Sequence, residues 1–271
     1  MKILVAVPVF NEERYVAPVM REIRKYSRAA AQAHGVEMRV LVVDDGSTDA
    51  TPAALCDMAA RGHIDLLTHP ENRGYGQSLI DAFAFAARHG YDWVITMDCD
   101  EQHEPCRIPV FVAECLRDDA DIISGSRYLA ANGNGSVPPP DRRNINRIIT
   151  DLLNSMLRLN LVGDSTDGLT DSFCGFKAHR VRALQRMNLT IPGYAFPMQF
   201  WVQAAALGLV IREIPVKLIY KDATRHFGGM LDDPMVRLQH YLGVLSDETS
   251  ATRDTLEPAT LSPPCECQCD A

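Results

Sequence analysis

Residues 93–105 read Trp93-Val94-Ile95-Thr96-Met97-Asp98-Cys99-Asp100-Glu101-Gln102-His103-Glu104-Pro105. The run that opens this stretch is apolar and short, which is typical of a buried strand. Asp98 and Asp100 therefore follow the carboxyl end of a strand, where open α/β sheets bind their ligands. Alternate residues of an extended segment point to the same side, so Gln102 can join the two carboxylates around one cation. Oxygen donors of this kind suit Mg²⁺ or Mn²⁺ shared with substrate phosphates.

Composition narrows the class of protein. The chain has 271 residues, of which 46% are hydrophobic, and a net charge of −8. This charge argues against a nucleic-acid partner. No window reaches the ~20 apolar residues of a membrane span, and the longest, residues 202–211, is interrupted by Gln203 and Gly208. The first eight residues read as a strand rather than a signal peptide, so we expect a cytoplasmic protein.

The cysteines fit a reducing compartment. Five of them lie in core-like segments without Cys-x-x-Cys spacing: Cys56, Cys99, Cys106, Cys115 and Cys174. The alternating thiols of Cys265, Cys267 and Cys269 could bind a soft metal. We favour a tail without fixed structure, because no histidine or second cysteine cluster completes a tetrahedral site.

Apolar runs and helical segments alternate along the first half of the chain. We predict strands at residues 2–9, 38–43, 64–68, 93–97 and 121–124. We predict helices from Asn11, as N-cap, to about residue 33, from Thr51-Pro52 onward, and at 76–89. Strands separated by helices imply crossover connections and a mostly parallel sheet flanked by helices.

Residues 124–143 break this alternation with glycines and three consecutive prolines. A loop of this length is usually functional or disordered. The helix expected at 144–160 carries a wide apolar stripe, formed by Ile145, Ile148, Ile149, Leu152, Leu153, Met156 and Leu157. We favour a core or homodimer face for this stripe. A membrane-surface face is the alternative, supported by Arg142, Arg143 and Arg147 at its start.

Three turns follow predicted strands at the expected ligand edge: residues 8–12, 44–47 and 72–77. Asp45 could accept hydrogen bonds from a base edge, and Glu12 from a ribose or base amine. Gly74 and Gly76 would let the backbone approach a ligand closely. None of the turns is a Walker A loop, and Gly-x-Gly-x-x-Gly is absent after the first strand, which argues against a dinucleotide enzyme.

Several motifs carry a resemblance to a known family: Val7-Pro8-Val9-Phe10-Asn11-Glu12-Glu13, Val42-Val43-Asp44-Asp45-Gly46-Ser47-Thr48-Asp49, Asn72-Arg73-Gly74, the Asp98–Gln102 segment, Gly125-Ser126-Arg127-Tyr128, Asp171-Ser172-Phe173-Cys174-Gly175-Phe176-Lys177 and Arg212-Glu213-Ile214-Pro215-Val216. In this order they resemble family 2 glycosyltransferases. Within the family the chain resembles the branch of dolichol-phosphate mannosyltransferases and polyprenyl-phosphate glycosyltransferases. The likeness covers residues 1 to about 220.

The resemblance implies one Rossmann-like nucleotide-diphosphosugar transferase domain of the GT-A type, an inverting transfer from a UDP- or GDP-sugar, and a Mg²⁺ or Mn²⁺ ion. It implies that Asp98, Asp100 and Gln102 hold the metal and the diphosphate. Asp100 would also be one of the catalytic residues. Pro8, Phe10, Glu12 and Asp45 would hold the nucleoside, and we add Asn11, Asn72, Gly74, Asp98 and Cys99 to the donor site. Arg127 would face a phosphate. Asp171 would be the base or a carboxylate that orients the acceptor.

The branch also usually has Arg-x-x-Gly-x-Ser-Lys after the Glu-x-Pro strand. Residues 222–230 keep Arg225 and glycines but lack Ser-Lys, and the sequence shows no C-terminal membrane anchor. We expect a polyprenyl phosphate acceptor, with the protein peripheral to a membrane. The alternatives are a soluble hydroxyl acceptor and a catalytically silent nucleotide-sugar-binding protein. We expect a catalytic domain at residues 1–220, a helical extension packing on it at 221–250, and a disordered tail at 251–271.

Overall fold

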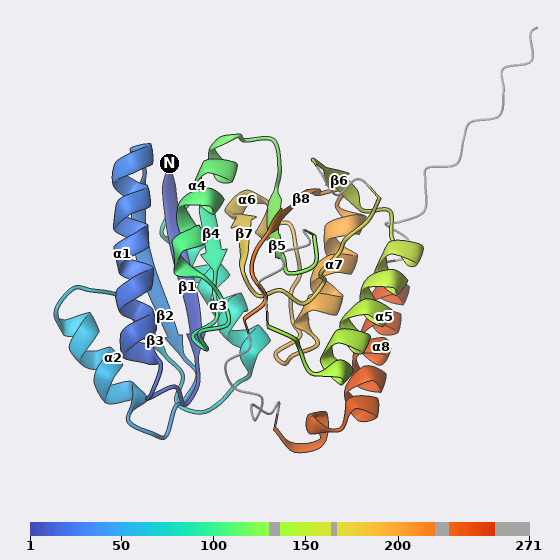
Figure 1. The fold of residues 1–271 in the computed structure, drawn as a ribbon, viewed down its shortest axis with the longest axis horizontal. Helices are drawn as coiled ribbons and strands as arrows, with labels where there is room; N and C mark the ends of the chain where they lie inside the picture. The colour runs from blue at the N-terminus through green and yellow to red at the C-terminus, as the bar shows by residue number, and fades with distance from the viewer. Residues whose placement is uncertain (130–135, 164–166, 220–227, 253–271) are drawn as a thin grey trace, which may run out of the picture.

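A computed structural model describes residues 1–129, 136–163, 167–219 and 228–252. A central sheet has helices on both of its faces (Figure 1). Its strands are β1 (Lys2–Val9), β2 (Glu37–Asp44), β3 (Asp65–Thr68), β4 (Trp93–Thr96), β5 (Ile122–Ser126), β6 (Asn160–Val162), β7 (Lys177–Arg180) and β8 (Val210–Pro215). Their order across the sheet is β3-β2-β1-β4-β7-β5-β8-β6.

The helices are α1 (Val16–His34), α2 (Thr51–Ala60), α3 (Tyr75–Arg88), α4 (Ile108–Leu116), α5 (Pro140–Met156), α6 (Val181–Leu184), α7 (Phe196–Ala206) and α8 (Pro234–Ala251), with 3₁₀ turns η1 (Pro105–Arg107) and η2 (Gly229–Asp232). One hydrophobic cluster lies between the sheet and α1 and α4. A second lies on the other face, under α3, α5, α7 and α8. The α/β architecture predicted from the sequence is confirmed.

One edge of the sheet gathers the segments that follow the strands. The parallel pairs β1–β2 and β1–β4 end together, with Val9 opposite Asp44 and Ala6 opposite Thr96. The exception is β7, which is antiparallel to both β4 and β5. Lys177, at the start of β7, pairs with Thr96 and with Ser124. The segment before β7 therefore enters the sheet at the edge where β1, β2, β4 and β5 end.

The predicted cap of the first helix is wrong. α1 begins at Val16, and Asn11 has a positive φ of 54° in the preceding turn. Its side-chain oxygen accepts a hydrogen bond from the backbone N–H of Thr48, at 2.8 Å. Asn11 therefore ties two ligand-edge turns together instead of starting a helix.

The helix expected at residues 144–160 begins earlier, at Pro140, and ends at Met156. Proline is well suited to the first helical turn, where its missing N–H costs nothing. Four of the seven stripe residues are buried, namely Ile145, Ile149, Leu153 and Leu157, so most of the stripe belongs to the core, which was one of the two favoured interpretations. Ile148 and Met156 are exposed at 39% and 45%.

Some sequence predictions fall outside the described residues: part of the glycine-rich loop, Arg225 with most of the 222–230 segment, and the cysteines of the tail. Among the described residues, no helix is long and apolar enough to cross a bilayer.

Candidate functional site

A cavity of about 490 Å³ opens at the ligand edge of the sheet. Most of the predicted site residues line it: Pro8, Phe10, Glu12, Asp45, Asn72, Gly74, Asp98, Cys99, Asp100, Gln102 and Arg127. Asn11 and Asp171 are not among the lining residues. One cavity thus joins the segments after β1, β2, β4 and β5.

The turn after β2 is held by Asp45, whose carboxylate is almost fully buried. It accepts hydrogen bonds from the backbone N–H groups of Arg73 and Gly74, both at 2.8 Å. The Nδ1 atom of His69 lies 2.6 Å from the same carboxylate, and its Nε2 lies 2.9 Å from Asp81. Asp45 therefore shapes the 72–74 turn, in addition to any contact with a nucleoside.

The turn after β1 contributes an aromatic surface to the cavity lining. Phe10 is 44% exposed at the mouth of the cavity, directly after β1. Glu12 is positioned through its backbone N–H, which donates to Thr51 Oγ1 at 2.9 Å. An exposed ring beside a turn of fixed geometry can stack on a planar base.

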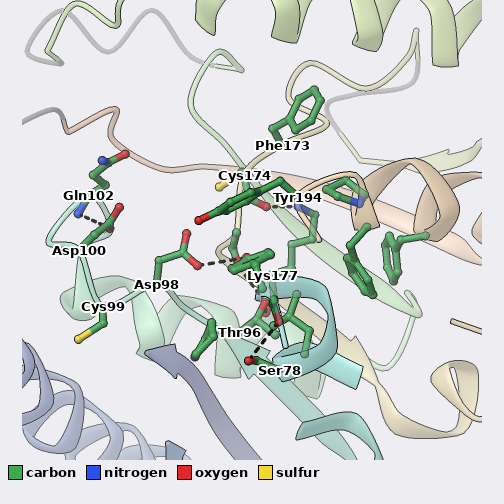
Figure 2. A pocket seen from close by; sticks show the side chains of 18 of the residues that line it. Ser78, Thr96, Asp98, Cys99, Asp100, Gln102, Phe173, Cys174, Lys177 and Tyr194 are labelled. Carbon is green, nitrogen blue, oxygen red and sulfur yellow. Dashed lines mark hydrogen bonds between the residues drawn. The ribbon is translucent and has the colours of Figure 1, made fainter. Parts of the chain in front are cut away.

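The residues after β4 supply the oxygen donors. Asp98 and Asp100 both face the cavity, whereas the sulfur of Cys99 points away from them (Figure 2). Cys99 is buried in the core under α1 and α4, so its side chain serves packing. Asp100 Oδ1 accepts a hydrogen bond from the backbone N–H of Gln102 at 3.0 Å, which holds the Asp100 carboxylate against the turn that carries Gln102.

This donor set fits a divalent cation. Burial raises the pKa of Asp98. Its carboxylate pairs with His103 Nε2 at 3.7 Å, and although burial opposes protonation of His103, the charge of Asp98 helps to raise the pKa of His103 to about 9. A divalent cation would compensate the acidic charge of Asp98 and Asp100 that this one imidazolium leaves. No group of three His, Cys, Asp or Glu side chains in the described part of the chain is placed to hold a metal alone. Mg²⁺ and similar ions commonly combine one or two carboxylates with substrate phosphates.

Asp98 has two neighbours that the sequence reading missed. The Tyr75 hydroxyl donates to Asp98 Oδ1 at 3.1 Å, and burial raises the pKa of Tyr75 well above its usual value, which keeps it a donor. A Cβ at Gly175 would lie 2.4 Å from Asp98 Oδ2. A side chain at position 175 would push the Asp98 carboxylate out of this position, so glycine lets the chain before β7 pass close to it.

Arg127 and Asp171 form a pair at the other end of the cavity. Asp171 is fully buried and accepts from Arg127 Nε at 2.6 Å and Nη2 at 2.8 Å. Asn146 of α5 donates to the same carboxylate at 2.7 Å. Burial opposes ionisation of Asp171, but the adjacent Arg127 guanidinium holds its pKa below the usual range. This arrangement favours an orienting carboxylate over a base.

A buried lysine side chain also lines the cavity. Lys177 is buried, lines the cavity and donates to the carbonyl oxygen of Cys174. Its ammonium lies 5.5 Å from the centre of the Trp201 ring. Burial lowers the pKa of Lys177. The Cys-Gly-Phe-Lys motif was the available signal for this residue, but nothing in that motif predicts that the lysine side chain enters the cavity.

Further arginines approach the cavity from α5 and α8. Arg142 and Arg237 both line it, and Arg237 Nη2 bonds to Asp141 at 2.6 Å, which joins the starts of the two helices. Arg147 instead pairs on the surface with Asp151, at 3.6 Å. Of the three basic residues predicted near the start of α5, only Arg142 lines the cavity.

Relatives of the chain have been described as lipid-linked sugar transferases. It is 27% identical to undecaprenyl-phosphate mannosyltransferase of Micrococcus luteus, over 89% of this chain and 94% of that protein. It is 26% identical to polyprenol monophosphomannose synthase of Mycolicibacterium smegmatis, over 79% of this chain and 76% of that one.

Solved structures share the fold at lower identity. Glucosyl-3-phosphoglycerate synthase of Mycobacterium tuberculosis, crystallised with Mn²⁺, UDP and glucosyl-3-phosphoglycerate, superposes with a TM-score of 0.62 at 18% identity, over 92% of this chain and 80% of that one. Mannosyl-3-phosphoglycerate synthase of Rubrobacter xylanophilus gives 0.65 at 14% identity, over 96% and 77%. Both support a GT-A fold.

The family follows from the sequence match itself. Residues 4–182, which include the segments after β1, β2, β4 and β5, match the family described as Glycosyl transferase family 2. The chain belongs to glycosyltransferase family 2.

Proposed function

We propose that this protein is an inverting, metal-dependent glycosyltransferase that moves a sugar from a UDP- or GDP-sugar to a polyprenyl phosphate. The observation that carries the proposal is the single cavity, which joins the carboxylates after β4 to the arginines at Arg127 and Arg142. A donor diphosphate needs a cation on carboxylates, and an anionic acceptor needs arginines. The lining of one cavity contains both kinds of side chain, which supports this assignment.

The donor would occupy the end formed by the turns after β1, β2 and β4. Phe10, Glu12 and Asp45 would contact the nucleoside, with Asn72 and Gly74 in the adjoining turn. Asp98, Asp100 and Gln102 would hold Mg²⁺ or Mn²⁺ against the diphosphate. When bound, the cation neutralises charge that develops on the leaving nucleoside diphosphate. Two of the described relatives carry polyprenyl-phosphate or polyprenol substrates in their names, which supports the choice of acceptor.

The acceptor end combines positive charge with exposed apolar side chains. Val137, which precedes α5, is 84% exposed, Met230 in η2 is 81% exposed, and Met235 in the first turn of α8 is 63% exposed. The Asp141–Arg237 bond brings the starts of these helices together. Exposed apolar side chains next to the segments that carry Arg142 and Arg237 suit an amphiphile with an anionic head group. A lipid phosphate is already ionised, so this acceptor requires Arg127 in place and no general base.

A soluble acceptor is the second candidate. Two structural neighbours are phosphoglycerate glycosyltransferases, whose acceptor is also anionic. The arginine end of the cavity would suit a phosphorylated small molecule as well. The exposed residues Val137, Met230 and Met235 favour the lipid.

The test is a transfer assay with UDP-glucose or GDP-mannose, Mn²⁺, and either a short-chain polyprenyl phosphate or 3-phosphoglycerate. We expect a glycolipid from the first acceptor. A glycosylated 3-phosphoglycerate without any glycolipid would reject the lipid. Binding of a nucleotide-sugar without transfer to either acceptor, or to water, would support the silent binding protein.

The metal assignment is tested by Asp98→Asn and Asp100→Asn. We expect each change to reduce transfer by about a hundredfold or more, because the metal–diphosphate bridge loses a charge, with an unchanged circular dichroism spectrum. The control is Asp57→Asn, an exposed carboxylate on α2 that pairs with Arg61. Near-native turnover of either site variant in Mn²⁺ would show that the assignment is wrong.

A further inference from the structure

Two tyrosines form a stacked pair in the wall of the cavity. The rings of Tyr75, at the start of α3, and Tyr194, just before α7, have centroids 5.8 Å apart and planes inclined by 15°. Both residues line the cavity, and Tyr194 is 38% exposed. The outer ring therefore presents aromatic surface beside the space where a ligand would bind.

The pair is held by close backbone packing. A Cβ at Gly74 would lie 2.4 Å from the carbonyl oxygen of Pro192, and one at Gly76 would lie 2.2 Å from that of Ile191. The backbone N–H of Gln77 also donates to the Pro192 carbonyl, at 3.0 Å. These contacts press the turn that carries Tyr194 onto the start of α3. The aromatic wall is thus set before any ligand binds.

The position of the pair relative to Asp98 indicates its ligand. The Tyr75 hydroxyl donates to Asp98 Oδ1 at 3.1 Å. In Figure 2 Asp98 lies between Asp100 and Gln102 on one side and Tyr194 on the other. If the diphosphate is bound through Asp98 and Asp100, the group attached to its far end lies next to the tyrosines.

We propose that Tyr194, backed by Tyr75, is the surface on which the hexose ring of the donor packs its C–H face. This inference rests on the proposed function, because it concerns the donor site. The face of an aromatic ring is electron-rich and apolar, and the C–H groups of a pyranose carry a small positive charge, so the two surfaces are complementary. Hydroxyl groups of the sugar would meet Ser78, Thr96 and Lys177, which line the same cavity.

The experiment compares nucleotides with and without a sugar. The affinities for UDP, UDP-glucose, GDP and GDP-mannose are measured by calorimetry with Mn²⁺ for the wild type, Tyr194→Phe and Tyr194→Leu. Phe keeps the ring, whereas Leu keeps much of the volume but no aromatic face. For whichever nucleotide-sugar the wild type binds, we expect Tyr194→Leu to raise the dissociation constant by roughly threefold to tenfold. The dissociation constant for the corresponding nucleotide without the sugar should change by less than about twofold. Tyr194→Phe should bind both ligands as the wild type does.

The remaining outcomes separate this inference from the proposed function. Equal weakening of nucleotide and nucleotide-sugar by Leu would place the ring on the nucleoside and overturn the inference. So would unchanged binding of both, or an effect confined to the KM for the acceptor. If the wild type binds no nucleotide in Mn²⁺, the proposed function fails and the inference fails with it. Melting of the three ligand-free proteins shows whether Leu disturbs the fold.

Discussion

At the scale of single residues, the surroundings of Asp171 decide what its carboxylate can do. It accepts hydrogen bonds from the guanidinium and the backbone N–H of Arg127, from Asn146 and from the backbone N–H of Phe173. A base needs a lone pair directed at the acceptor and a pKa near the working pH. Asp171 is fully enclosed, and Arg127 lowers its pKa in spite of burial.

Replacing Asp171 by Asn tests whether this carboxylate orients Arg127 or acts as a base. The amide would leave the Arg127 cation without its counter-charge, and breaking a buried pair costs about 3–5 kcal/mol of unfolding free energy. We expect lower stability in urea and a raised KM for a phosphate acceptor. Adding Arg127→Gln removes the uncompensated charge, so the double variant should regain part of the stability. Wild-type stability and KM in Asp171→Asn, with the acidic limb of the pH–rate profile lost, would instead identify a base.

At the scale of elements, the start of α3 depends on Gly76, whose backbone conformation is ordinary but which has no room for a side chain. The Cβ of an alanine at position 76 would lie 2.2 Å from the Ile191 carbonyl oxygen and 2.9 Å from Phe196 Cβ. We expect Gly76→Ala to cost about 1–3 kcal/mol through overpacking and to raise the KM for the donor by displacing Tyr194. Gly243→Ala on α8 is the control, because nothing lies within 4 Å of its Cβ position and alanine favours a helix. Equal stability of the two variants in urea would contradict the tight packing.

The elements also show where sequence patterns stop being informative. The β1, β2 and β4 strands are apolar, and their predicted positions are confirmed to within a residue or two. β7 reads Lys-Ala-His-Arg, a pattern that predicts no buried strand, yet all four residues are buried. Contacts distant in sequence make this possible: the Arg180 guanidinium lies 4.5 Å from the centre of the Trp93 ring and bonds to the Ala120 carbonyl. The Tyr75–Tyr194 pair was missed for the same reason.

At the scale of the whole molecule, β7 lies in the middle of the sheet and carries a titratable group into the core. His179 is buried between the rings of Phe83 and Phe200, each 5.1 Å away by centroid. Burial, followed by the charge of Lys177, lowers the pKa of His179 to about 3. The folded protein therefore keeps this imidazole neutral at pH values where an unfolded chain would protonate it.

This difference predicts how global stability depends on pH. Between an unfolded pKa of about 6.5 and the folded value, the unfolded state binds a proton at His179 that the folded state does not, so the free energy of unfolding falls as pH falls. Relative to pH 7.5 or above, the loss at pH 5 from this one group is about 2 kcal/mol. Urea unfolding at pH 7.5 and pH 5 measures the total change, to which other groups contribute. Repeating both measurements on His179→Asn isolates the histidine, because the variant should lose less stability on acidification by about that amount. Parallel pH profiles for the two proteins would mean that His179 is not the group that links the folding of the sheet to pH.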